Sequence, residues 1–263
     1  MRPPSTACGV LGNSRAKNNY DPDILGKKLK KSVLNLGCEG MVLMYDRAVM
    51  DLLLQKYTPE LFIVNIEALS IVGTRIFHLS RIKALTPFID KSPVLRKMIY
   101  DFSPFERLKY LVQSYRYNGK AFPILYNNIV KDKSGMGFKP RQGTLKKGAP
   151  QAEYVKDPTG IHEYMVGILC AIIRQAKESG VKIVFVNTPF WRSDFKINPA
   201  FIQRRDYLER LFREENVPYL TINLENTPQF HDPTLFKDYV HLNEQGARIF
   251  SDMLAQWILE NNR

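Results

Sequence analysis

Short apolar runs alternate with helical patterns along most of the chain. The runs are ACGVLG, SVLNLG, LFIVNI, VKIVFVN and PYLTIN, and they are rich in Val, Ile and Phe. Apolar runs of this length, separated by helices, are typical of parallel strands that are buried on both faces. The pattern therefore predicts a three-layer α/β/α domain with about five parallel strands.

Amphipathic helical patterns fill the spaces between these runs. They cover residues 22–31, 41–56, 161–176 and 199–215, and Gly180 is placed to end the third of them. The last helix is expected to begin at Asn243, a residue type that is favoured as a helix N-cap. The predicted elements follow each other in the order expected of a doubly wound fold.

Residues 70–156 interrupt this alternation. The stretch begins with the helical and aromatic sequence PFERLKYLVQSYRY and continues into the loop sequence KDKSGMGFKPRQGTLKKGAP. An insertion after the third strand starts at the carboxyl edge of the sheet, where doubly wound folds bind ligands. We therefore expect a single domain over residues 1–263, in which residues 70–156 form a basic lid or cap.

The charge of the chain is concentrated in this insertion. Residues 70–156 contain 17 Lys and Arg but 5 Asp and Glu, while the remainder has 21 of each, so the whole net charge of +12 falls there. A basic wall of the active-site cleft would favour an anionic substrate. A separate stripe, with Tyr110, Tyr115, Tyr117 and Phe122 among its cations, would favour nucleic acid, anionic glycan or a membrane surface instead.

Composition and motifs do not favour a membrane-spanning, disulfide-bonded or metal-binding protein. No apolar run approaches the ~18 residues of a membrane span, and the first residues, MRPPSTACGV, lack a signal-peptide pattern. Cys8, Cys38 and Cys170 are odd in number and lack metal-ligand spacing, so buried thiols are expected instead of disulfides. No phosphate-binding glycine motif is present, and neither a metal nor a cofactor is expected.

The first candidate for chemistry is Ser14. The first run ends in VLGNSRAKNN, which places Ser14 at the turn between a strand and a helix, with Gly12 allowing a tight turn. The positive end of a helix dipole favours a developing oxyanion at such a serine. The alternative interpretation is that Ser14 only caps the helix.

Two further short motifs with candidate catalytic residues lie after the second apolar run and in the loop before the last helix. Gly37 and Gly40 in NLGCEG could offer backbone N–H groups to an oxyanion, although glycine also suits an ordinary turn. In KDYVHLNEQG, Asp238 precedes His241 by three residues, and both side chains face one way if the segment turns helically. His241 would then take the Ser14 proton while Asp238 orients the ring, unless both are ordinary surface residues.

The order of these blocks resembles that of the SGNH/GDSL hydrolase family. The resemblance covers residues 7–69 and 157–260 and implies the flavodoxin-like SGNH hydrolase fold. It places the nucleophile at Ser14, the oxyanion hole at the N–H groups of Ser14 and Gly40, and the acid and base at Asp238 and His241. The remaining histidines are not assigned a role, because they are isolated or, as in the adjacent pair His231 and Asp232, fit loop polarity.

The third sequence motif of the family is not matched in this chain. In the family a strand ends in G-x-N-D, whose Asn donates to the oxyanion, but this position falls on Leu69 in LFIVNIEALS. Asn65 lies inside the strand, where a buried and hydrogen-bonded side chain is expected. Arg15 or Asn18 would have to replace the missing donor. Arg15, Asn18, Asn65 and Arg141 are the candidates for substrate contact.

The sequence LGNSR resembles the G-N-S-R form found in envelope-associated bacterial members of the family. The resemblance implies a serine esterase or O-acyltransferase acting on acetyl or other small acyl esters of carbohydrate or envelope polymer, without cofactor. A location in the cell envelope or periplasm is expected if an N-terminal anchor precedes the chain, and the cytoplasm is the alternative. The competing function is a catalytically weak SGNH-like module that binds anionic glycan, a membrane surface or, less expectedly, nucleic acid.

Overall fold

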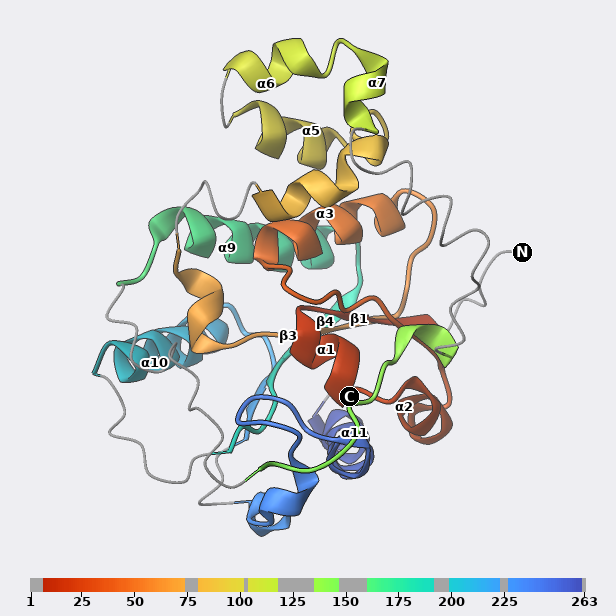
Figure 1. Cartoon of the computed structure of the whole chain (residues 1–263), viewed down its shortest axis with the longest axis vertical. Helices are drawn as coiled ribbons and strands as arrows, with labels where there is room; N and C mark the ends of the chain where they lie inside the picture. The colour runs from red at the N-terminus through yellow and green to blue at the C-terminus, as the bar shows by residue number, and fades with distance from the viewer. Residues whose placement is uncertain are drawn as a thin grey trace.

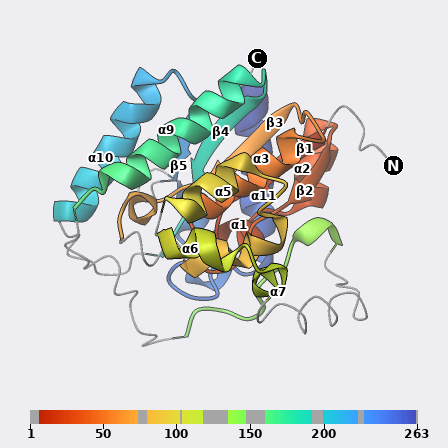
Figure 2. The same ribbon diagram turned by 90° about the horizontal axis from the view of Figure 1, so that it is seen from above.

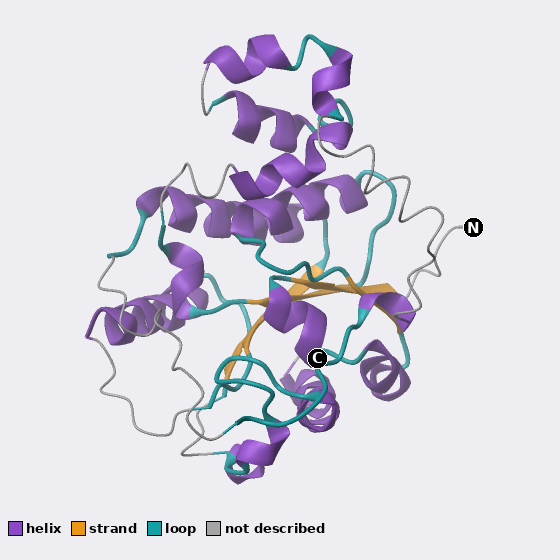
Figure 3. Cartoon of the chain, viewed as in Figure 1, coloured by secondary structure: helices purple, strands orange, loops and turns teal. Residues whose placement is uncertain are grey.

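The apolar runs form one parallel sheet. The structure is a computed structural model that describes residues 7–73, 80–101, 104–117, 135–146, 160–191, 199–222 and 227–261. The sheet has the strand order β2-β1-β3-β4-β5 and lies at the centre of the molecule (Figure 3). Its strands are β1 (Ala7–Leu11), β2 (Ser32–Asn35), β3 (Leu61–Asn65), β4 (Lys182–Asn187) and β5 (Tyr219–Thr221). The predicted α/β/α fold class is confirmed.

Helices cover both faces of the sheet, as Figure 1 shows. The strand residues alternate between two cores: Phe62 and Val64 belong to one, and Leu61 and Ile63 to the other. The first core is closed by α3 (Leu43–Leu54), α9 (Glu163–Glu178) and α10 (Pro199–Glu214), and the second by α1 (Ser14–Asn19), α2 (Pro22–Leu29) and α11 (Glu244–Asn261). Burial on both faces explains why the strands appear in the sequence as continuous apolar runs.

One helix was not separated in the sequence prediction. The predicted first helix begins near Pro22, whereas the structure places the short helix α1 directly after β1 and starts a second helix, α2, at Pro22. Asp21 caps α2 by accepting hydrogen bonds from the N–H groups of Asp23 and Ile24 at 2.9 and 3.3 Å. A helix as short as α1 contains less than two turns, so its pattern has no readable period.

The helical part of the insertion forms a further layer outside α3. It contains η2 (Lys83–Phe88), α5 (Pro93–Tyr100), α6 (Pro104–Lys109) and α7 (Gln113–Arg116), which lie beyond α3 in Figure 1 and over it in Figure 2. Asp51 of α3 accepts a hydrogen bond from Ser92, the N-cap of α5, at 2.5 Å and another from Gln175 of α9 at 3.1 Å. The lid role of residues 70–156 stays a prediction, because residues 74–79, 118–134 and 147–159 lie outside the described residues.

The glycine-rich part of the insertion lies on the opposite side of the sheet. Residues 135–146 begin with η3 (Gly135–Gly137) and cross from β2 to the start of α11. Gly137 has φ +88°, and a Cβ there would come within 1.9 Å of the Asn35 carbonyl oxygen, so only glycine fits. The backbone of Lys139 donates to the Lys17 carbonyl at 3.1 Å, and that of Glu244 to the Arg141 carbonyl at 2.9 Å. The insertion therefore borders the nucleophile helix as well as α3.

None of the helices in the described ranges combines the length and the apolar character needed to cross a membrane.

Candidate active site

Ser14 is the first residue of α1 and follows β1 through a tight turn. Gly12 in this turn has φ +136°, and a Cβ on it would lie 2.8 Å from the Asn65 Cβ and 2.9 Å from the Ala16 Cβ. Asn13 is the N-cap of α1, and its Oδ1 accepts a hydrogen bond from the Arg15 N–H at 2.9 Å. Because Asn13 caps the helix, the interpretation of Ser14 as the cap is wrong, and its hydroxyl faces another partner.

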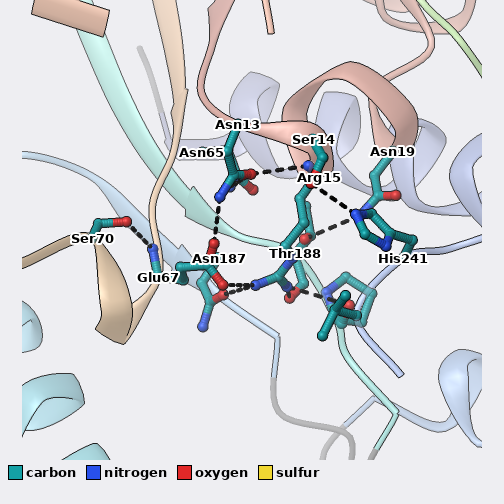
Figure 4. A network of polar contacts seen from close by, with 12 residues as sticks. Asn13, Ser14, Arg15, Asn19, Asn65, Glu67, Ser70, Asn187, Thr188 and His241 are labelled. Atoms are coloured by element: carbon teal, nitrogen blue, oxygen red, sulfur yellow. Dashed lines mark hydrogen bonds and ion pairs between the residues drawn. The ribbon is translucent and has the colours of Figure 1, made fainter. Parts of the chain in front are cut away.

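That partner is His241. The Ser14 Oγ lies 2.8 Å from the His241 Nε2, and the Nδ1 of the same ring lies 2.9 and 3.0 Å from the two carboxylate oxygens of Asp238. The Ser14–His241 contact is drawn in Figure 4. A carboxylate beside Nδ1 selects the tautomer in which Nδ1 carries the proton, which leaves Nε2 as an acceptor for the serine hydroxyl. The three predicted residues thus form a continuous hydrogen-bonded chain.

The loop that carries Asp238 and His241 is not helical, contrary to the expectation for this spacing. The Asp238 Oδ1 accepts the backbone N–H groups of Val240 and His241, both at 2.9 Å, and Phe236 pairs with Leu242 in an isolated antiparallel bridge. The carboxylate therefore folds the loop back on itself and brings its own side chain under the imidazole. An Asx-type turn achieves what the sequence analysis assigned to a helical turn.

The environment of Asp238 keeps it ionised. Partial burial acts to raise its pKa, but hydrogen bonds from the His241 ring and the neighbouring charge, together with the N–H groups of Val240 and His241, outweigh burial and lower the pKa below the ordinary aspartate value. A carboxylate that stays charged at neutral pH can stabilise an imidazolium. Asp238 is therefore suited to orienting His241 and not to acting as an acid.

Behind the nucleophile, the Arg15 side chain is buried at 3% exposure and joins the ends of two strands. Its Nη1 donates to the Glu67 Oε2 at 3.0 Å and to the Asn187 Oδ1 at 3.3 Å, and its Nη2 donates to the Thr188 carbonyl (Figure 4). Glu67 follows β3, whereas Asn187 ends β4 and Thr188 follows it. The guanidinium thus ties the first turn of α1 to the carboxyl ends of β3 and β4.

Two asparagines of α1 extend this framework. Asn18 is buried and donates to the Ser14 carbonyl at 2.5 Å. Asn19 donates to the Thr188 Oγ1 at 3.2 Å and accepts the Leu242 N–H at 3.2 Å, so it links α1 to the residue after His241. Sequence reasoning did not assign a role to Asn19, Thr188 or Glu67. The polar pair Asn18–Asn19 just after the nucleophile was the one available signal.

Three of the four residues that were expected to contact substrate make contacts within the protein instead. Arg15 and Asn18 are buried, and the Arg15 Nη1 and Nη2 and the Asn18 Nδ2 donate within the protein. The Arg15 Nε has no partner among the described residues but is itself buried, so the missing oxyanion donor is assigned to neither side chain. Asn65 is buried as expected for a strand residue, accepts the Tyr20 hydroxyl at 3.0 Å and donates to the Asn13 Oδ1 at 3.4 Å. All three residues position the turn instead of facing a substrate.

Arg141, the fourth candidate, lies elsewhere. Its Nη2 is 3.3 Å from the Glu39 Oε1, and the side chain is partly exposed. Glu39 precedes Gly40 in the chain, so the ion pair joins the glycine-rich part of the insertion to the predicted oxyanion loop. A contact between Arg141 and substrate stays a prediction.

The predicted oxyanion loop lies against the nucleophile turn. The Cys38 N–H donates to the Gly12 carbonyl at 2.9 Å, and Gly40 adopts a left-handed conformation with φ +70°. Among the described residues, the backbone N–H groups of Ser14 and Gly40 have no hydrogen-bond acceptor. Both donors are therefore available for an oxyanion, as the sequence resemblance implied.

An arginine that the sequence analysis did not single out lies beside this loop. A Cβ built on Gly40 would come within 3.0 Å of the Arg81 Nη1, so the guanidinium of the insertion covers this glycine. Leu69, at the family's Asn position, lies in η1 (Ala68–Ile71) and has no donor on its side chain. Arg81 is thus a cationic donor close to a site that lacks the usual amide.

The buried thiol of Cys8 and the distribution of metal-type side chains are separate features of the described residues. Burial raises the pKa of Cys8, inside β1, to about 12. Within the described ranges, no three or more His, Cys, Asp or Glu side chains gather in a group that could hold a metal ion.

Comparisons with known proteins place the fold. No protein-family model and no curated protein matches the chain. Among solved structures, a candidate acylhydrolase from Bacteroides fragilis is 12% identical with a TM-score of 0.50, over 100% of this chain and 92% of that one. A candidate lipolytic protein of the G-D-S-L family from Desulfitobacterium hafniense is 13% identical with a TM-score of 0.49, over 95% and 98%. The chain has the α/β/α fold predicted from its resemblance to SGNH hydrolases.

Proposed function

We propose that this chain is a serine-dependent carboxylic ester hydrolase. The observation that carries the proposal is the hydrogen-bonded chain from the Ser14 Oγ through the His241 ring to Asp238, with distances of 2.8 and 2.9 Å. A module that only binds its ligand has no need for a histidine that accepts a serine proton and is oriented by a carboxylate. The contact therefore favours catalysis over the alternative of an inactive binding module.

The geometry supports a two-step reaction. The Ser14 Oγ attacks the ester carbonyl carbon while its proton passes to the His241 Nε2, and Asp238 stabilises the imidazolium. The tetrahedral intermediate collapses when the C–O bond to the alcohol breaks and His241 returns the proton to the leaving oxygen. Water then attacks the acyl-enzyme, with His241 as base, and releases the acid. A sugar hydroxyl in place of this water would make the protein an O-acyltransferase.

The oxyanion of both intermediates needs donors. The backbone N–H groups of Ser14 and Gly40 are assigned to it, since neither has an acceptor within the described part of the chain. We assign the Arg81 guanidinium beside Gly40 as the third donor, in place of the side chain absent at Leu69. One such donor is worth about 2.7–4 kcal/mol of transition-state stabilisation.

For the substrate, we favour a small acyl ester, acetyl above all, on a carbohydrate or envelope polymer. This part rests on the sequence resemblance to envelope-associated members of the family. The basic insertion next to the site, which includes Arg141, favours an acceptor with negative charge. A location in the cell envelope is part of the same proposal.

The test combines turnover with covalent labelling. The parent should hydrolyse p-nitrophenyl acetate and react with a fluorophosphonate probe, and Ser14→Ala should lose both. Ser179→Ala is the matched control, because Ser179 lies at the distant C-cap of α9. Labelling that persists in Ser14→Ala would exclude Ser14 as the nucleophile. If the parent protein shows neither labelling nor turnover, the proposal that it is an esterase is excluded.

A further inference from the structure

Helix α6 buries polar groups and exposes apolar ones, the reverse of an ordinary surface helix. Glu106 and Tyr110 face inward at 5% and 2% exposure. The outward surface, called here the α6 patch, consists of Phe105 and Leu108 of α6 and of Leu111 and Val112 in the turn after it, which are 70%, 60%, 72% and 58% exposed. Phe105 and Leu108 are three residues apart and lie on one side of α6, and Leu111 and Val112 follow directly in the turn that leads to α7. Contiguous exposed apolar residues indicate an interaction site.

The inward contacts fix this orientation. The Glu106 Oε1 is 2.9 Å from the Lys109 Nζ and 3.3 Å from the Lys83 Nζ of η2. Burial acts to raise the pKa of Glu106, but the two lysines outweigh it and lower the pKa below its ordinary value. Tyr110 packs edge to face against Tyr115, with ring centroids 5.4 Å apart. Turning the leucines inward would place a paired carboxylate in solvent and break these contacts.

The layer that carries the patch is basic. Residues 80–117 contain eight Lys and Arg but three Asp and Glu. Each of the three acidic side chains is paired with a cation: Asp90 with Arg96 at 3.8 Å, Asp101 with Lys97 at 2.6 Å, and Glu106 with its two lysines. The exposed cations of this layer include Lys91 and, within α6 itself, Arg107.

The patch also lies where a flat partner can reach it. Helices α5, α6 and α7 form the outermost layer beyond α3 in Figure 1, at the end of the molecule's longest axis. Phe88 of η2 and Tyr117 after α7 are 46% and 48% exposed and add apolar and aromatic surface to the same layer. Leucines and aromatic rings among exposed lysines and arginines are the composition of helices that lie in a membrane interface.

We propose that the α6 patch docks this protein on the surface of an anionic phospholipid bilayer. Leu108, Leu111 and Val112 would enter the boundary between headgroups and acyl chains, and exposed cations of the same layer, such as Arg107, would contact lipid phosphates. Charge complementarity favours this partner over a second copy of the chain, because two such basic layers would repel each other. A nucleic acid would use the cations but leave the leucines exposed.

Vesicle sedimentation of the full chain tests the proposal. The parent should bind vesicles with about one third phosphatidylglycerol in phosphatidylcholine, bind pure phosphatidylcholine at least about tenfold more weakly, and dissociate as salt rises. The double variant Leu108→Ser/Leu111→Ser should lose at least about tenfold in partition coefficient. The matched control, Ile202→Ser/Leu259→Ser, changes two exposed apolar residues of α10 and α11 and should bind like the parent.

Two further variants keep the outcome clear. Arg107→Glu leaves the apolar patch intact and should weaken binding to the anionic vesicles alone. Ser14→Ala should bind like the parent, so a failure of the esterase proposal leaves this test unaffected. Equal binding of the parent and the Leu108→Ser/Leu111→Ser variant, each with a cooperative melting transition, would overturn the proposal. So would self-association in the absence of lipid that the same variant abolishes.

Discussion

Arg15 and Glu67 form an ion pair of 3.0 Å directly behind the nucleophile. Glu67 also accepts a hydrogen bond from Asn13 at 2.5 Å, so one carboxylate holds the residues on both sides of Ser14. Asn13 caps the helix and Arg15 reaches the end of β4, and the position of the Ser14 Oγ is therefore determined from two directions. The pair is a structural element of the site and not a ligand for substrate.

The first prediction concerns this pair. Glu67→Gln keeps the shape of the side chain but leaves the buried guanidinium without its counter-charge, which should destabilise the fold by about 3–5 kcal/mol. Urea denaturation of both proteins measures the difference. The control is Asp101→Asn, which removes an exposed pair with Lys97 and should change stability by less than about 1 kcal/mol. Equal effects of the two changes would contradict the scaffold role of Glu67.

The second prediction concerns Asp238. Asp238→Asn should lower kcat for p-nitrophenyl acetate by about 10³–10⁴-fold, because the amide favours the wrong histidine tautomer. Asp232→Asn is the control, since Asp232 only caps η7 (Pro233–Leu235). The pKa of Asp238 is depressed in the folded state, so its stabilising contacts are present above the ordinary aspartate value and are lost as pH falls through the lower one. A loss below tenfold in kcat would exclude the orienting role.

Asp46 gives the third prediction, on pH and stability. This carboxyl of α3 is buried, accepts the Gly12 N–H, and burial raises its pKa from 3.8 to about 7. The folded state therefore holds a proton between about pH 4 and 7 that the unfolded chain releases, so stability should fall as pH rises through this window. Asp46→Asn keeps the acceptor for Gly12 and should flatten this fall, with a gain of about 1–4 kcal/mol at pH 8 relative to the parent.

Urea denaturation at several pH values between 4 and 8 measures the Asp46 effect. Asp23→Asn provides the control, because Asp23 is an exposed residue in the first turn of α2. If the parent and Asp46→Asn show parallel stability curves over this range, the carboxyl does not take up the proton on folding.

Arg81 gives the fourth prediction. If its guanidinium donates to the oxyanion, Arg81→Ala should lower kcat by about 10²–10³-fold while KM changes little. Arg81→Lys should recover part of the rate, because an ammonium keeps the charge but not the planar fork. Lys97→Ala removes an exposed cation of the same insertion and serves as the control. A change in KM alone would assign Arg81 to substrate binding.

The sequence predicted the sheet because the central strands β1, β3 and β4 are buried on both faces and so appear as apolar runs, while the edge strands β2 and β5 are short apolar runs that are less buried. It also predicted Ser14, Asp238 and His241, because carboxyl ends of parallel strands meet at one edge whatever the details of packing. The contacts of Arg15 could not be predicted in this way. They depend on which side chains the ends of β3 and β4 bring together, and Glu67 and Asn187 stand in no fixed spacing from the nucleophile.

Helix α6 shows a different limit of sequence patterns. A periodic pattern of Phe105, Leu108 and Leu111 predicts that these residues face the core, but the ion pairs of Glu106 hold the opposite face inward. The orientation of α6 depends on Lys83, a partner of the buried Glu106 that lies outside the local segment. A short window of sequence does not contain that information. The Asx turn at Asp238 was missed for a similar reason, since the spacing of two residues fits more than one backbone path.

The fifth prediction concerns the basic rim of the proposed site. Arg141 pairs with Glu39 next to Gly40, and Lys146 is exposed in the same part of the insertion, whereas Lys147 lies outside the described residues. Changing Arg141 and Lys146 to Ala should raise KM for an anionic acyl ester several-fold and barely change KM for a neutral one. The physical reason is electrostatic attraction that is screened over about 8 Å at physiological salt, so the preference of the parent for the anionic ester should shrink as salt rises.

Kinetics on a matched pair of acetyl esters, with and without a carboxylate on the alcohol, measure both effects. Replacement of Lys177 and Lys182 by Ala removes a cation of α9 and one at the amino end of β4, away from the carboxyl ends of the strands, and is the control. A preference that does not depend on salt, or equal effects on both esters, would show that these cations serve packing instead of substrate attraction.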